Sequence, residues 1–432
     1  MKDLTKYFIS FFIIYTIIAI FNTYFVYYLP FYFYDVLKVE NELLAILQMI
    51  VLFTPVFLPP LLGILYDRIN KYNHAIVSIA CLILPFAFFF VLSNMEDIFN
   101  FFLFFTFAYS AIWLIRGAMI KNYLNALSTE DKDLQASIMT KTVYISQSSS
   151  ILGTLLTMVL YFSINDISSV ADWRLFLFLG FFISLPILSS IFLNTTIRPS
   201  INLISDTEKK MNHRLTKKSK YHLLIPIIST VLLMFFTETD ELYRYSLPSW
   251  IGTAFSYQSL DIYFKTVILS YFCAIFGNFL AKKLYSRFIT KISKKNELPS
   301  DKLEELKGVF IRKVLLFLFI SYQAILWWSF NSDFFTFIII WWTLLPILGS
   351  ALKIYLTFLI SRQAIQLKKY KTTAYMLQTS IANIGMLVFT PIGIFLYPII
   401  GMRLLVLVSI IISTFYLIIN LHQISSSKKN GF

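Results

Sequence analysis

Charged residues are scarce in this sequence. Asp, Glu, Lys and Arg make up 14% of its 432 residues, whereas about a quarter of a typical soluble chain is charged. Hydrophobic residues account for 58% and aromatic residues for 18%. Such a chain has too few polar groups to cover its apolar surface in water, so the composition excludes a soluble globular protein.

Cysteine and histidine are also rare. The two cysteines, Cys81 and Cys273, each lie inside an apolar stretch, which excludes a disulfide framework and a cysteine metal site. The four histidines are far apart at the ends of apolar stretches or between them, and no nucleophile motif is present. We therefore expect no enzyme, no cofactor and no metal.

The apolar residues fall in long blocks, each near the roughly 20 residues that a helix needs to cross a bilayer. In lipid the backbone must satisfy its own hydrogen bonds, and the period-2 alternation of a barrel is absent. The blocks predict an all-α polytopic membrane protein with about twelve transmembrane helices. They lie near residues 7–30, 42–66, 74–92, 99–124, 141–162, 173–192, 221–243, 262–284, 309–330, 334–360, 372–397 and 401–421.

A strongly basic stretch separates the first six blocks from the last six. We expect residues 1–193 to form an N-terminal six-helix bundle, residues 194–220 a basic cytoplasmic linker, and residues 221–432 a C-terminal six-helix bundle. The formal charge of +14 lies in short segments between blocks and at the chain ends, so no nucleic acid partner is expected. Lys and Arg gather in alternate loops, which predicts a multi-pass cell membrane protein with both termini in the cytoplasm.

A short motif follows the second block. The segment from Gly63 to Lys71 reads GILYDRINK, with a glycine, an acid and two bases at fixed spacing. It resembles the loop signature between helices 2 and 3 of the major facilitator superfamily. The resemblance implies that Gly63 admits a neighbouring helix and that Asp67 meets a helix N-terminus and a nearby arginine, with Arg68 and Lys71 completing a gate. The family usually has glycine where Asn70 stands, and a plain basic turn is the alternative.

The second half repeats part of this motif. The segment from Gly277 to Lys283 reads GNFLAKK, which keeps the spacing from the glycine to Lys282 and replaces the acid by Ala281. Two halves of six spans are typical of a duplicated transporter. The resemblance implies alternating access, in which two six-helix bundles rock around a site at the membrane midplane.

Ionisable residues inside spans are costly, so each one is a functional candidate. Arg116 in the fourth span and Lys353 in the tenth occupy equivalent positions in a duplicated chain, and both could face a cavity that binds a carboxylate or phosphate. Snorkelling of these side chains to the interface is the alternative. Glu238, Asp240 and Glu241 in the seventh span are candidates for proton coupling, and Asp240 lies one turn before Arg244 on the same helix face.

Polar residues inside other spans are further candidates for substrate binding, with helix–helix hydrogen bonding as the alternative. They include Asn22, Gln147, Gln378 and Asn383. Together these features predict a secondary transporter. The expected partners are a small polar or anionic organic solute, a proton or another cation, and the lipid bilayer. We expect proton coupling, with symport as the working mode, and a functional monomer, and the sequence also permits antiport and uniport. Drug or metabolite efflux and a non-transporting receptor or scaffold are the alternative functions.

Overall fold

The computed structural model describes most of the long helices of the chain. The described residues are 2–23, 32–33, 37–68, 97–127, 132–163, 171–172, 174–175, 178, 235–236, 238–255, 262–263, 266–267, 269–280, 283, 316–366 and 370–429. Within these ranges the regular structure is helical, and none of it is a strand. The basic stretch predicted to link the two halves lies outside them.

The chain divides into two compact units, of which the first draws on both halves of the sequence and the second on the C-terminal half alone. Unit 1 comprises Met1–Glu238 and Leu356–Pro391, and unit 2 comprises Thr239–Tyr355 and Ile392–Phe432. A segment of the second half, residues 356–391, therefore packs with the first half. The sequence predicts a simpler division, with bundles at 1–193 and 221–432.

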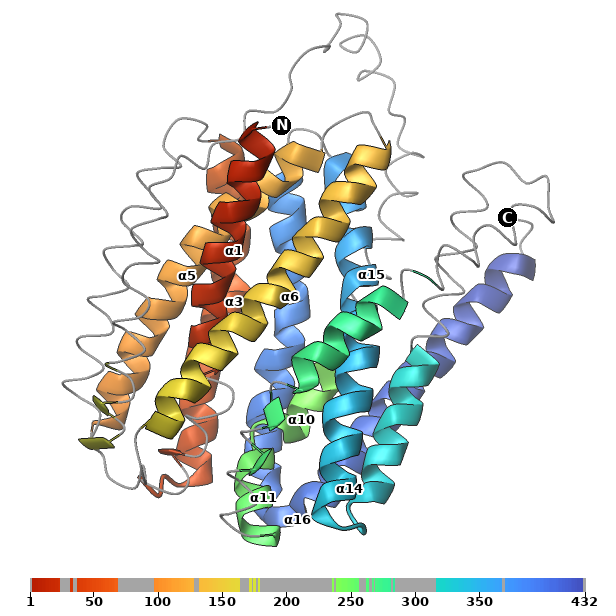
Figure 1. The fold of residues 1–432 in the computed structure, drawn as a ribbon. Helices are drawn as coiled ribbons and strands as arrows, with labels where there is room; N and C mark the ends of the chain where they lie inside the picture. The colour runs from red at the N-terminus through yellow and green to blue at the C-terminus, as the bar shows by residue number, and fades with distance from the viewer. Residues whose placement is uncertain are drawn as a thin grey trace, which may run out of the picture. The chain divides into compact units, whose positions relative to one another are not determined.

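The described residues of unit 1 include four long helices from the first half of the sequence (Figure 1). They are α1 (Lys2–Thr23), α3 (Asn41–Arg68), α5 (Ile98–Leu127) and α6 (Lys132–Ser163), and α1 packs on α6 while α3 packs on α5. Between α1 and α6 the backbones come close, because a Cβ on Gly153 would lie 2.7 Å from the Cβ of Ala19. The hydroxyls of Thr23 and Thr154 share a hydrogen bond of 3.0 Å nearby. Small residues and hydroxyl pairs are typical of helix contacts in membranes.

Unit 2 is built from shorter helical pieces. They are η5 (Glu238–Asp240, whose first residue is in unit 1), α10 (Glu241–Arg244), α11 (Leu247–Ala254), the helices Leu269–Leu280 and Leu316–Ser329, α14 (Phe334–Ile339), and the π-helix η6 (Ile340–Leu344). Two longer helices, α15 (Leu345–Gln366) and α16 (Lys371–Lys429), contribute to both units. Asp333 begins α14 by accepting the backbone N–H of Thr336 at 2.9 Å, and this bond lowers the pKa of its exposed carboxyl.

Helix α16 is two spans joined at a glycine. Gly401 has φ +76°, a conformation that side chains with a Cβ rarely adopt, so a glycine is needed at this turn. The sequence predicts spans at 372–397 and 401–421, and the break at Gly401 confirms that boundary.

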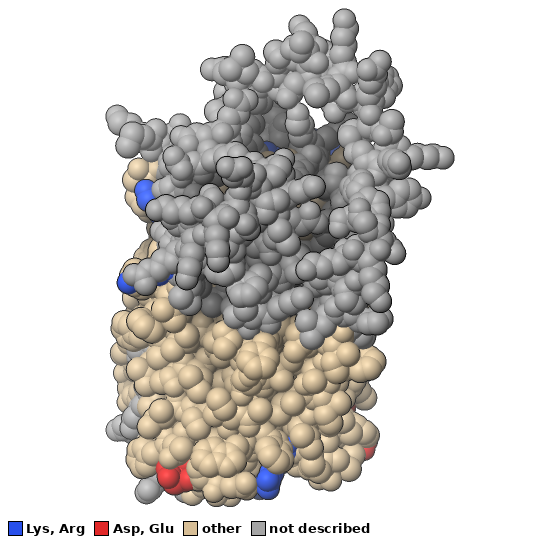
Figure 2. Space-filling model, turned by 90° about the vertical axis from the view of Figure 1, so that its right-hand side faces the viewer, with Lys and Arg blue, Asp and Glu red and all other residues tan. Residues whose placement is uncertain are grey.

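Three described helices are long and apolar enough to cross a membrane: Asn41–Arg68, Lys141–Ser163 and Lys371–Ile418. Large apolar side chains project from them, including Leu61 at 64% exposure, Val159 at 61% and Phe415 at 63%. Figure 2 shows one face of the molecule, on which most of the described surface belongs to residues other than Lys, Arg, Asp and Glu. Hydrocarbon chains solvate such a surface better than water does.

One predicted span boundary is wrong, and another helix is longer than its span. The stretch of α6 that is long and apolar enough to cross a membrane is Lys141–Ser163, which matches the span predicted near 141–162, and the helix itself begins earlier, at Lys132. The seventh span was expected to be continuous up to residue 243. Its described part is broken into η5, α10 and α11, with a turn at residues 245–246. Pro248 explains the new start at α11, because a proline lacks the backbone N–H and is favoured in a first helical turn.

Candidate functional site

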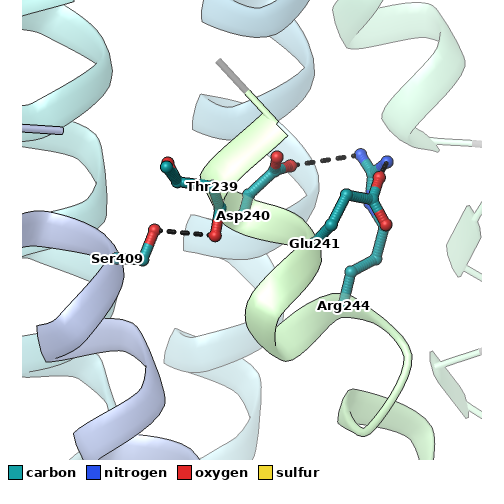
Figure 3. Close-up of polar contacts among 5 residues, drawn as sticks. All are labelled: Thr239, Asp240, Glu241, Arg244 and Ser409. Atoms are coloured by element: carbon teal, nitrogen blue, oxygen red, sulfur yellow. Dashed lines mark hydrogen bonds and ion pairs between the residues drawn. The ribbon is translucent and has the colours of Figure 1, made fainter. Parts of the chain in front are cut away.

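Charged side chains gather among the described residues in an acidic turn, which we define as residues 238–244; Glu238 is assigned to unit 1 and the rest of the turn to unit 2 (Figure 3). Arg244 contacts both neighbouring acids, with Nη1 2.6 Å from Glu241 Oε1 and Nη2 3.4 Å from Asp240 Oδ2. The side chains of Asp240 and Glu241 are 8% and 1% exposed, and that of Arg244 is 29% exposed. The one-turn pairing of Asp240 with Arg244 is the one that the sequence predicts. Together the three side chains carry one negative charge when both carboxyls are ionised.

Glu238 opens the acidic turn, as the first residue of η5. Its carboxylate lies within 4.8 Å of the carboxylates of Asp240 and Glu241. On its other side, the helix α16 approaches closely, because a Cβ on Gly385 would lie 3.0 Å from the Cβ of Glu238 and 2.8 Å from the carbonyl oxygen of Phe235. Glu238 is half-buried, whereas Asp240 and Glu241 are buried. The turn therefore gathers the three acids that the sequence singles out.

Hydroxyl groups of α16 hold the acidic turn from one side. Ser409 Oγ donates to the Thr239 carbonyl at 3.0 Å, as Figure 3 shows, and the hydroxyls of Thr239 and Ser413 lie 2.8 Å apart. Ser409 also lies 3.0 Å from Gln323 Oε1. Backbone contact is tight beyond the turn, since a Cβ on Gly393 would lie 2.8 Å from the Cα of Leu242. The break in the seventh span is therefore braced, and its carboxylates have a fixed position.

Aromatic residues surround the acidic turn within unit 2. Tyr243, Tyr263 and Tyr322 are each no more than 2% exposed, and all three interact electrostatically with Arg244. The ring of Tyr243 packs edge-on against Trp341 of the π-helix, with centroids 6.0 Å apart. Neither the Tyr243 nor the Tyr322 hydroxyl has a hydrogen-bond partner among the described residues. Buried hydroxyls without partners are uncommon and mark places where a proton or a ligand atom can be bound.

A second polar contact joins α3 to α16 inside unit 1. We call it the α3–α16 contact and define it by Gly63, Asp67, Thr372 and Thr373. Asp67 accepts hydrogen bonds from Thr373 N at 2.8 Å, Thr373 Oγ1 at 2.8 Å and Thr372 N at 3.2 Å. These amides are the N–H groups that the first turn of a helix leaves without an internal acceptor, so Asp67 caps α16 from another helix. A Cβ on Gly63 would lie 2.6 Å from Thr373 Cα.

Bases lie near Asp67 as well. Lys121 of α5 is buried, interacts electrostatically with Asp67 and donates through Nζ to the carbonyl of Tyr66. The Tyr66 hydroxyl in turn donates to the Leu114 carbonyl at 2.6 Å. Lys371 at the start of α16 also interacts with Asp67. The nearby base implied by the family resemblance is therefore a lysine within the described residues and not an arginine.

Replacing Asp67 by asparagine should loosen the start of α16. Hydrogen bonds to a charged acceptor contribute about 1.5–3 kcal/mol, and asparagine presents one neutral acceptor oxygen in place of a carboxylate. We expect the amides of Thr372 and Thr373 to exchange with deuterium at least about tenfold faster in Asp67→Asn than in wild type. Asp97, which caps α5 at Phe99 N and Asn100 N, provides the matched control, because Asp97→Asn should leave exchange at residues 372–373 unchanged. Equal exchange at these amides in Asp67→Asn and wild type would contradict the role of Asp67.

The other motif residues have different surroundings. Arg68 is exposed at the end of α3, and Lys71 and Lys282 lie in segments that the structure does not describe. Gly277 is a point of close approach like Gly63, since a Cβ there would lie 2.7 Å from Ile347 Cα. Ile347 belongs to α15 and thus to the same half of the sequence. The two glycines therefore contact different partners, although their loops have similar spacing.

The substrate-binding candidates are spread over several helices. Arg116 in α5 is half-buried with its guanidinium 4.7 Å from the ring centre of Trp113, and its Nε has no hydrogen-bond partner among the described residues. Gln147 in α6 and Gln378 in α16 each have a buried side-chain oxygen in the same condition. Asn383 instead donates to the carbonyl of Pro55 at 2.7 Å. Asn22 lies in α1 and Lys353 in α15, but the described part of the chain does not include their side chains.

Several residues of these sites could not be found by their chemistry alone. Thr372 and Thr373 act through backbone amides, and Tyr243 and Tyr322 have the composition of ordinary core residues. The sequence did contain one sign that α3 needs polar partners from another helix. Pro59 and Pro60 are adjacent inside an apolar span, where proline removes backbone donors.

The architecture matches that of a known transporter. A solved structure described as the crystal structure of a bacterial homologue of the iron transporter ferroportin in outward-facing state covers 98% of this chain and 100% of its own. The TM-score is 0.60 and the sequence identity is 11%. The chain has the major facilitator fold. This fold is polytopic and all-α, so the predicted fold class and the family resemblance at the level of fold are confirmed.

At 11% identity, the likeness to the ferroportin homologue concerns the major facilitator fold and not the substrate. No family model matches the sequence, and no curated protein matches it either. The residues of the acidic turn and of the α3–α16 contact are therefore the features that bear on function.

Proposed function

We propose that this chain is a secondary transporter that moves a small polar or anionic organic solute across the cell membrane by alternating access, coupled to a proton. The major facilitator fold supports the transport class. The observation that carries the coupling proposal is the acidic turn, where Asp240 and Glu241 are buried against a single guanidinium, that of Arg244. Transferring an uncompensated carboxylate out of water is costly, and one bound proton neutralises the excess charge of Asp240, Glu241 and Arg244.

The protonation of the acidic turn would then change with the conformational state of the transporter. In a state where water reaches the acidic turn, Asp240 and Glu241 can both ionise, and one of them takes up a proton before the turn is closed off. Tyr243 and Tyr322 supply hydroxyls beside the pair that can donate to an ionised carboxylate. The coupling assignment rests on Asp240 and Glu241 more than on Glu238, because these two carboxylates are the buried ones.

Arg116 supports a solute with an acidic group. Its Nε–H is buried without an acceptor among the described residues, and the face of Trp113 covers part of the guanidinium. A carboxylate or phosphate supplies two acceptors in the geometry that a guanidinium prefers. We propose Arg116 as the group that contacts the anionic part of the solute.

A screen with the purified chain tests this function. Thermal shifts across sugars, organic acids, amino acids and nucleosides would identify a ligand, and uptake of that ligand would be followed in reconstituted vesicles with an inward proton gradient. We expect accumulation that a protonophore abolishes and that Arg116→Ala weakens through a higher KM. Uptake equal to that of empty vesicles for every stabilising compound would refute the transport proposal.

A divalent metal cation is a second candidate cargo. The three carboxylates of the acidic turn lie within 4.8 Å of one another, and oxygen ligands of this kind bind hard divalent cations. The solved structure of similar fold is described as a homologue of an iron transporter. Uptake of Mn²⁺ or Fe²⁺ into the same vesicles, lost in Asp240→Asn and retained in Arg116→Ala, would favour the metal over the organic solute.

A further inference from the structure

Three prolines inside α3 remove helical donors, and two of the carbonyls freed in this way accept hydrogen bonds from another helix. In an α-helix the carbonyl of residue i accepts the N–H of residue i+4, and proline has no N–H. Pro59 and Pro60 therefore leave the carbonyls of Pro55 and Val56 without their helical bonds. Both carbonyls lie in an apolar span, where an unsatisfied carbonyl is costly.

Side chains of α16 donate hydrogen bonds to both carbonyls. Asn383 Nδ2 donates to the Pro55 carbonyl at 2.7 Å, and Ser380 Oγ donates to the Val56 carbonyl. Ser380 is buried, with 3% exposure. Its neighbour Thr379 shows the usual behaviour of a helical hydroxyl, since it donates to the Tyr375 carbonyl of its own helix at 3.0 Å. The hydroxyl of Ser380 therefore bonds across to α3 where Thr379 bonds within α16.

These bonds continue the α3–α16 contact along both helices. Asp67 and Gly63 meet the start of α16 at Thr372 and Thr373, and the two proline-freed carbonyls meet it further along, at Ser380 and Asn383. Residue numbers decrease along α3 as they increase along α16, so the two helices run antiparallel along one continuous seam. The partners belong to opposite halves of the sequence, which alternating access must separate.

We propose that Ser380 and Asn383 form a reversible latch on the carbonyls freed by Pro59 and Pro60, and that this latch sets how often the α3–α16 seam opens. The proposal rests on the alternating-access function proposed above. Opening breaks no helical bond of α3, because the prolines have already removed those bonds. Ser380 can then turn to the Met376 carbonyl of its own helix, as Thr379 does with Tyr375, and water can solvate the α3 carbonyls.

The latch can be tested without a known substrate. Spin labels at Leu61 of α3 and Leu377 of α16, which are 64% and 47% exposed, would report the separation of the two helices by double electron–electron resonance. Cys81 and Cys273 would first be replaced by serine, and the full chain would be held in lipid nanodiscs. We expect Asn383→Ala and Ser380→Ala each to raise the long-distance fraction about fivefold, as the loss of one net hydrogen bond predicts. Thr379→Ala is the matched control and should leave the distances unchanged.

Restoring the missing donors provides the decisive comparison. Pro59→Ala gives the Pro55 carbonyl a helical N–H, so Asn383→Ala should change the long-distance fraction less than about twofold in that background. In the same way, Ser380→Ala should have a smaller effect on the long-distance fraction in the Pro60→Ala background. This second pair of variants is independent of the first and can be used if Asn383→Ala fails to fold. Ser380→Thr keeps the hydroxyl and should behave as wild type.

An undiminished effect of Asn383→Ala and Ser380→Ala in the matching alanine backgrounds would overturn the latch, because the side chains would then act by packing alone. Unchanged distances in every variant would overturn it too. Failure of the proposed function has a different signature, in which the two distances and their response to the variants persist but no compound enters vesicles.

Discussion

Replacing Arg244 with alanine should destabilise the protein by about 3–5 kcal/mol, because it leaves two buried carboxylates beside each other without their guanidinium. We expect a large fall in the melting temperature of the detergent-solubilised chain, measured by size-exclusion chromatography after heating. Acidic buffer should restore part of the loss, since protonation neutralises Asp240 and Glu241. The double variant Arg244→Ala with Glu241→Gln should also be more stable than Arg244→Ala alone.

Arg403 offers the matched control for this experiment. Its guanidinium lies 4.6 Å from the ring centre of Trp327 and the residue is exposed, so Arg403→Ala removes a cation–π contact that contributes only about 0.5–1 kcal/mol. If Arg244→Ala and Arg403→Ala melt at the same temperature, the acidic turn does not hold ionised carboxylates, and the electrostatic account of the site is wrong.

Adding a single methyl group at Gly63 should force the α3–α16 seam apart. The new Cβ would lie 2.6 Å from Thr373 Cα, and a backbone atom cannot move aside as a flexible side chain can. Overpacking of this kind costs about 1–3 kcal/mol, all of it in the closed arrangement of α3 and α16. We expect Gly63→Ala to populate the long distance between labels at Leu61 and Leu377 more strongly than the loss of either latch residue.

Gly349 in α15 provides the comparison for Gly63. No atom lies within 4 Å of a Cβ built on Gly349, so Gly349→Ala should leave the label distances unchanged and should stabilise the helix by at most about 1 kcal/mol. A Gly63→Ala variant with the same distances as Gly349→Ala would show that the close approach of α3 to α16 does not matter for closure.

The fold class was predictable because a bilayer imposes a simple rule on sequence. Each span needs about 20 apolar residues, and the boundary at Gly401 could be placed because Pro398 and Gly401 interrupt one long apolar stretch. The same rule places the fifth span near Lys141 correctly, but it does not show that the helix continues back through polar residues to Lys132. Hydropathy reports the solvent of a helix and not its ends.

The sites were predictable only in part, and the reason differs between them. Asp67 and Gly63 could be assigned a neighbour from the family resemblance, and Asp240 with Arg244 from the spacing of one helical turn. Which carboxylates are buried depends on how α10 packs, and no local pattern encodes that. The role of Asn383 as a donor to α3 became visible only when Pro59 on a distant span was placed beside it.

The acidic turn also explains why proline and π-helical segments meet in unit 2. Pro248 starts α11 after a break, and the π-helix at residues 340–344 turns Trp341 toward Tyr243. Irregular helices inside a membrane protein are tolerated where protein or a cavity surrounds them, and they often mark functional positions. The sequence showed the tryptophans but not the irregularity that places them.

The most direct test of the proton-coupling proposal is proton movement during transport by Glu241→Gln. This substitution keeps the shape of the side chain and the Asp240–Arg244 pair, and it removes the extra negative charge of the turn. Vesicles that contain a pH-sensitive dye would receive the first ligand shown to be transported. We predict that wild-type protein moves protons with the ligand, while Glu241→Gln exchanges labelled for unlabelled ligand with neither a pH change nor accumulation. Ligand-driven proton movement at the wild-type rate in Glu241→Gln would contradict the account.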